Sequence, residues 1–80
     1  MAEIKYEIEK EIAVISENYK GYKRELNLIS WNGYPAKYDI RDWTDGHERM
    51  TKGLTFTAEE LGKLRDVLNE LDLPTEELPE

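Results

Sequence analysis

The 80-residue sequence contains no cysteine, a single histidine and no long apolar run. The absence of cysteine excludes disulfides and thiolate metal sites, and His47 alone cannot build a histidine-rich metal cluster. No apolar run approaches the roughly 20 residues that a membrane-spanning helix needs, and Glu3 and Lys5 give the first five residues a charged character that is unlike a signal peptide. We therefore expect a cytoplasmic protein that uses no cofactor, metal or membrane.

The residues that catalysis requires are also scarce. An enzyme needs a nucleophile, a base and an orienting group within reach of one another. His47 lies in a charged turn beside Asp45 and Glu48, where solvated surface is the expected role. Asp39 and Asp42 cannot face the same side of a regular strand, so they form no carboxylate pair for acid–base work. The sequence predicts no enzyme and no small-molecule substrate.

Small size and uneven charge characterise the chain. Eighty residues form one domain with a thin core, and without disulfides or metals the usual compensation is a homodimer. The net charge of −7 at first argues against a polyanionic ligand. Residues 20–52, however, carry seven basic and five acidic side chains and are the only basic segment. Local charge decides what a site binds, so nucleic acid is not excluded.

Four runs with strand-like alternation precede one helical run. We expect strands at residues 4–15, 22–32, 37–43 and 50–56, separated by turn sequences such as Asn18–Gly21. Thr57 and Glu60 form a capping box, and the apolar spacing that follows predicts a helix to Asp72, before Pro74. The expected fold is α+β, with a four-stranded antiparallel sheet followed by one C-terminal helix. It occupies residues 1–73, and residues 74–80 form an acidic flexible tail.

Two tryptophans and three cations share one predicted sheet face. Even positions of the second and third strands, such as Leu26 and Ile40, are expected to face the core. The odd positions then share the other face: Lys23, Asn27, Ile29, Trp31, Lys37, Asp39, Arg41 and Trp43. Aromatic rings that stack on unpaired bases, with cations that meet phosphates, are what single-stranded nucleic-acid binding requires. From the pattern alone, buried or interfacial tryptophans fit equally well. For the cations, the pattern alone favours a solvated surface with Asp39 and Asp42 as ion-pair partners.

Three motifs occur in a specific order. They are Tyr38-Asp39-Ile40-Arg41-Asp42-Trp43, then Lys52-Gly53-Leu54-Thr55-Phe56, then the capped helix start Thr57-Ala58-Glu59-Glu60-Leu61. This arrangement resembles the transcriptional positive cofactor four family of single-stranded-DNA-binding coactivators, particularly its small bacterial members. The resemblance covers most of the chain, from about Tyr6 to Leu71. The serine-rich acidic extension of the eukaryotic members is missing, so their coactivator regulation is not carried over.

The resemblance implies a homodimer with packed helices, whose curved sheets form paired channels for unpaired DNA. It implies that Arg41 and Lys52 contact the DNA backbone and that Trp31 lies near the family's stacking aromatic. Arg24 and Lys37 are then phosphate contacts on either side of Trp31. Trp43 fits less directly, because the loop after it is shorter than in the family. The full expected nucleic-acid-binding set is Lys23, Arg24, Trp31, Lys37, Arg41, Trp43 and Lys52.

A protein-interaction module is the competing interpretation. In that case the leucine stripe of the helix joins two copies, and the aromatic sheet face binds a peptide or protein. Leu61, Leu64, Leu68 and Leu71 have coiled-coil-like spacing, but two heptads are too few for an independent coiled coil. The stripe is equally compatible with both ligand classes, and the sequence leaves DNA and RNA open as partners.

Overall fold

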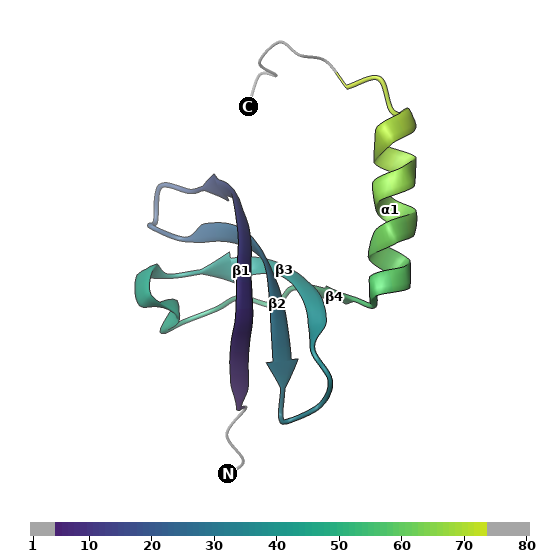
Figure 1. Cartoon of the computed structure of the whole chain (residues 1–80). Coiled ribbons are helices and arrows are strands. Elements are labelled where there is room, and N and C mark those ends of the chain that lie inside the picture. The colour runs from purple at the N-terminus through teal and green to yellow at the C-terminus, as the bar shows by residue number, and fades with distance from the viewer. Residues whose placement is uncertain (1–4, 74–80) are drawn as a thin grey trace.

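The computed structural model describes residues 5–73 (Figure 1). It contains four strands and one α-helix: β1 (Tyr6–Glu17), β2 (Lys23–Trp31), β3 (Lys37–Trp43), β4 (Leu54–Phe56) and α1 (Ala58–Glu70), with a short 3-10 turn η1 (Asp45–His47) between β3 and β4. The strands form one antiparallel sheet in the order β1-β2-β3-β4. This confirms the predicted β-β-β-β-α fold. The predicted tail at 74–80 lies outside the described residues.

Local sequence explains where the main elements begin and end. The Asn18 side chain accepts hydrogen bonds from the backbone N–H groups of Lys20 and Tyr22, which closes the turn between β1 and β2. Thr57 and Glu60 form the predicted capping box, and α1 starts at the next residue after Thr57. The helix ends at Glu70, two residues earlier than predicted, because Leu71 already adopts an extended backbone.

The most buried side chains lie at odd positions of β2 and β3. Ile29, Trp43 and Asp39 are fully buried, and Asn27 and Glu25 are nearly so. The prediction that the even positions form the core is therefore wrong for the single chain. Those even positions are only half-buried: Leu26, Leu28, Tyr38 and Ile40.

Curling of the sheet explains why the odd face is buried. Trp31 pairs with Tyr6 at one end of β2, whereas Trp43 pairs with Lys23 at the other end. Eight residues of extended strand separate these ends by about 26 Å, yet the Tyr6 ring lies within 5.6 Å of Trp31 and 5.4 Å of Trp43, between ring centroids. The sheet must curl around its odd face to bring these rings together. Register shifts in β1, one of them next to Lys10, supply local bends.

The helix covers little of the other face. Figure 1 shows α1 standing beside the sheet, and its contacts with the sheet come from β3 and β4. A groove of about 550 Å³ separates α1 from the even face of the sheet. Its apolar lining comes from both elements: Ile15, Leu26, Tyr38, Ile40, Leu61, Leu64 and Leu68. The even face is thus apolar but incompletely covered within one chain.

The last predicted strand is interrupted. Trp43 forms an isolated β-bridge with Met50, and regular pairing resumes between Ile40 and Leu54. Between these two points, the three residues 51–53 lie opposite the two residues 41–42. The predicted strand at 50–56 therefore reduces to β4, because this bulge breaks the ladder. Gly53 lies at the bulge, where a Cβ would overlap Arg41 Cβ and the carbonyl oxygen of Ile40.

We predict that Gly53→Ala destabilises the fold by roughly 1–3 kcal/mol, because a backbone oxygen and a Cβ cannot give way without shifting β4. Urea denaturation measures the change. Gly21→Asn is the matched control, since space around Gly21 is open and asparagine tolerates its φ of +86°. Equal stability of Gly53→Ala and the unmodified chain would contradict the close approach.

Candidate nucleic-acid interface

A row of four rings crosses the curled face. Tyr6 lies between Trp31 and Trp43, and the ring of His47 meets Trp43 edge-on with centroids 5.2 Å apart. Trp43 is fully buried inside this row, whereas Trp31, at the end of β2, is only partly buried. The expectation that Trp43 offers its ring to a base is therefore wrong, because neither ring face is open. Trp31 is the tryptophan that solvent reaches.

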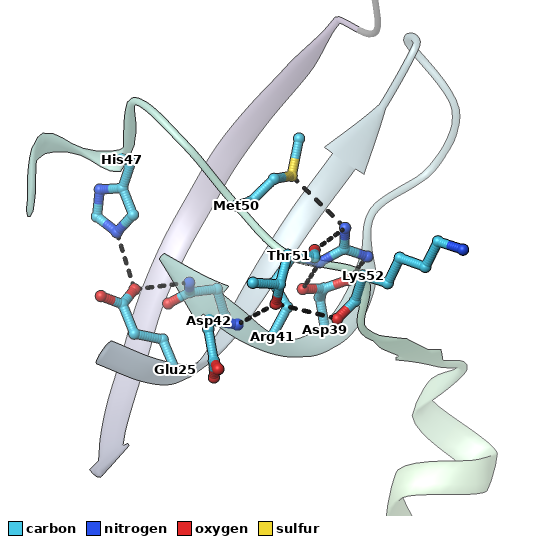
Figure 2. Close-up of polar contacts among 9 residues, drawn as sticks. Glu25, Asp39, Arg41, Asp42, His47, Met50, Thr51 and Lys52 are labelled. Carbon is cyan, nitrogen blue, oxygen red and sulfur yellow. Dashed lines mark hydrogen bonds and ion pairs between the residues drawn. The ribbon is translucent and has the colours of Figure 1, made fainter. Parts of the chain in front are cut away.

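The guanidinium of Arg41 covers the Trp31 ring. Its Cζ lies 4.5 Å from the ring centroid, a cation–π distance. Asp39 holds the same guanidinium with two parallel hydrogen bonds of 2.7 Å, from Nε and Nη2 (Figure 2). Longer contacts run from Nη1 to the carbonyl oxygen of Thr51 and the sulfur of Met50, at 3.4 and 3.5 Å. Arg41 is thus fixed between β3 and the segment that follows η1.

A second polar cluster fixes the turn η1 on the sheet. His47 Nε2 lies 2.8 Å from Oε1 of Glu25 (Figure 2). The same carboxylate oxygen accepts a hydrogen bond from the Asn27 amide. The Tyr6 hydroxyl donates to the carbonyl oxygen of His47 over 2.8 Å. The prediction of a solvated His47 is wrong, because these contacts and Trp43 half-bury it. Alternation along β2 predicted that Asn27 lies on this face. The sequence pattern did not predict that Glu25 and Tyr6 would contact His47, which lies more than 20 residues further along the chain.

The five expected cations differ in their partners. Lys23 pairs with Asp45 at 3.2 Å, and Arg24 pairs with Asp42 at 2.8 Å. A hydrogen bond and the charge of the acidic partner raise the pKa of Lys23 and of Arg24 above their ordinary values. Arg41 pairs with Asp39, as described above. The other two cations, Lys37 and Lys52, are exposed and make no ion pair with residues 5–73.

The structure brings only part of the expected set together. Trp31 and Arg41 are in direct contact, and Lys52 directly precedes Gly53, which packs on Arg41. Figure 2 shows the Lys52 side chain pointing away from the polar clusters. Arg24 pairs across the sheet with Asp42 at an even position, so it lies on the face opposite Trp31. The cations therefore surround the site from different sides instead of lining one face.

Two further features bear on the class of protein. Within residues 5–73, no group of three or more histidine, cysteine or acidic side chains is arranged to hold a metal ion. No helix in this part of the chain is long and apolar enough to cross a membrane. The curled four-stranded sheet, its single capped helix and its partly open tryptophan beside cations define a small α+β domain with the features of a nucleic-acid-binding module.

Comparison with known proteins identifies the family. The family model described as Transcriptional Coactivator p15 (PC4) matches residues 18–67. The chain is also 44% identical, over 68 residues, to an uncharacterised protein of Treponema pallidum (strain Nichols), covering 85% of this chain and 80% of the relative. The chain belongs to the transcriptional coactivator p15 (PC4) family, which confirms the resemblance found in the sequence. The family is a DNA-binding, non-enzymatic one.

We predict that Trp43→Ala lowers the free energy of unfolding by roughly 3–5 kcal/mol, the range for a fully buried large aromatic. Trp31→Ala is the control, and it should cost clearly less, because solvent already reaches that ring. Chemical denaturation followed by far-ultraviolet circular dichroism measures both variants without relying on tryptophan emission. Similar losses for the two variants would contradict the different roles assigned to the rings.

Proposed function

We propose that the chain binds single-stranded DNA with little sequence preference, stacking unpaired bases on Trp31 and meeting phosphates with nearby cations. The observation that carries this proposal is the Trp31 side chain, which is partly exposed at the end of β2 and in contact with Arg41. Lys37 and Lys52 are the first choices for phosphate contacts, because both are exposed and unpaired among the described residues. Lys23 and Arg24 are weaker candidates, because acidic partners already neutralise them. Lys23 also lies at the other end of β2 from Trp31, and Arg24 lies on the opposite face.

The chemistry of stacking explains the expected lack of sequence preference. Every base has a ring face, so a base–aromatic stack gains about 1–3 kcal/mol with little regard to identity. In a duplex the bases already stack on each other, so no base offers a free ring face on which Trp31 can stack. Binding of this kind suits any process that exposes unpaired DNA in the cytoplasm of a bacterium, including transcription, replication and repair.

Charge limits the affinity but leaves the proposal intact. The net charge of −7 repels a polyanion at long range. Within a Debye length of about 10 Å at 0.1 M salt, however, the local cations determine the interaction. The strongly acidic part of the sequence is residues 53–80, whereas the candidate site lies in the basic segment, residues 20–52. We therefore expect binding that is strongest at low salt.

We expect Trp31→Ala to weaken binding to a labelled single-stranded oligonucleotide by about 1–3 kcal/mol, nearly equally for each of the four homopolymers. Fluorescence anisotropy, with matched single- and double-stranded DNA and RNA, measures the affinities. Tyr19→Ala is the control, because Tyr19 is an exposed aromatic in the turn at the far end of β2. No response of the unmodified chain to any oligonucleotide would favour the competing peptide- or protein-binding module.

We propose further that two copies of the chain form a homodimer through the groove between α1 and the sheet. The groove is apolar, and large apolar side chains beside it are exposed in the single chain. Ile15 of β1 and Leu68 of α1 line the groove, and Val67, Leu71 and Leu73 are exposed on α1 or just beyond it. A homodimer that covers these side chains would supply much of the buried apolar area that a single chain of this size lacks.

Light scattering at micromolar concentration should give twice the mass of one chain. Leu68→Glu should shift this mass to that of a monomer, because it places a charge in the apolar groove. Lys63→Glu is the control on the same helix, since Lys63 is exposed and does not line the groove. A monomer mass for the unmodified chain would refute the homodimer.

A further inference from the structure

Arg41 has little hydrogen-bonding capacity left for a ligand. All three guanidinium nitrogens already have partners within the chain: Nε and Nη2 donate to Asp39, and Nη1 contacts Thr51 and Met50. An arginine clamps a phosphate with a pair of N–H groups, on its Nε/Nη2 edge or its Nη1/Nη2 edge. Asp39 occupies the first edge, and the contacts of Nη1 with Thr51 and Met50 block the second. Only about 13% of the Arg41 side chain is exposed. Both edges that could meet a phosphate are therefore occupied.

Asp39 keeps Arg41 in this position. Its side chain is fully buried, and Arg41 is the partner of both carboxylate oxygens. Removing the guanidinium would leave a buried carboxylate without a counter-charge, which is strongly unfavourable. A phosphate could bind the Arg41 guanidinium only if the new contact offset the cost of leaving Asp39 unpaired. We therefore expect Arg41 to stay on Asp39 when a ligand binds.

The packing around Arg41 directs its flat group onto Trp31. Gly53 lies against the Arg41 stem so closely that a Cβ there would overlap it. The guanidinium then lies over the Trp31 ring, with 4.5 Å between Cζ and the ring centroid. Tyr6 touches the same tryptophan at a tilt of 46°. Trp31 is thus held by a planar cation in addition to an aromatic neighbour.

We propose that Arg41 serves the single-strand site as a layer that fixes the Trp31 ring, not as a phosphate contact, and that Asp39 is its positioning residue. This inference rests on the proposed function. The Arg41–Asp39 pair is neutral as a unit, so it adds nothing to the attraction for phosphates. The salt-sensitive part of the affinity then comes from exposed lysines such as Lys52. The role differs from the backbone contact that the motif resemblance implies for Arg41.

The experiment measures single-strand affinity against salt for four proteins. Lys52→Gln should make the log–log slope shallower by about 0.7, the value for one neutralised phosphate on a single strand. Asp39→Asn combined with Arg41→Gln keeps the net charge and replaces the ion pair by neutral amides. This double variant should keep the slope of the unmodified chain and bind about two- to fivefold more weakly, as expected for a lost cation–π layer at a partly exposed ring.

Arg41→Lys is the fourth protein and covers the case in which the double variant does not fold. Lysine keeps the charge and a partner for Asp39 but lacks the flat group. It should bind about two- to fivefold more weakly with an unchanged slope. It should also alter the near-ultraviolet circular dichroism of the indoles in the absence of DNA, which tests the Trp31 layer independently of binding.

Each outcome bears on a different claim. A slope shallower by about 0.7 in the double variant overturns the inference, because Arg41 would then neutralise a phosphate. Unchanged affinity in Arg41→Lys, or an unchanged indole spectrum, also overturns it. No binding by the unmodified chain refutes the proposed function instead, whereas the indole spectrum still reports whether Arg41 orders Trp31.

Discussion

Tyr6 packs between Trp31 and Trp43. Trp31 lies at one end of β2, whereas Trp43 of β3 pairs with Lys23 at the other end. The contact is possible only because the sheet curls, and the curl buries the odd face of β2 and β3. Trp43 becomes the centre of the core, while Trp31, at the rim, stays partly open. The same curl brings Glu25 to His47 and so fixes η1 over the sheet. The shape of the candidate site therefore follows from one aromatic contact.

Internal pairing decides which charges remain for a ligand. The buried carboxylates of Glu25 and Asp39 lie on the concave face, where each has a basic or imidazole partner. Both contacts organise the site, and the Asp39–Arg41 pair contributes little net attraction for phosphates, because its two opposite charges largely cancel. Lysines outside the pairs keep their full charge toward solvent. A strongly acidic chain can in this way present a locally cationic edge beside an aromatic ring.

The two faces of the sheet have different roles. The concave face is closed within one chain by aromatic rings and ion pairs, and it carries the candidate site. The opposite face is apolar, half-buried and separated from α1 by a groove. Such a division suits a small domain, in which one surface binds the ligand and the other supplies the buried area that a single chain lacks.

Local sequence was sufficient for the order of the elements, the capped start of α1 at Thr57 and the alternation that places Trp31 and Arg41 on one face. These features depend on contacts between residues close in the chain, such as Thr57 with Glu60. The tertiary structure alone decided which face is buried, that Trp43 is core, that His47 meets Glu25, and that Asp39 holds Arg41 on Trp31. Alternation assigns residues to two faces but does not say which face is concave. That choice depends on the direction in which the sheet curls, and the curl arises from contacts between rings distant in the sequence.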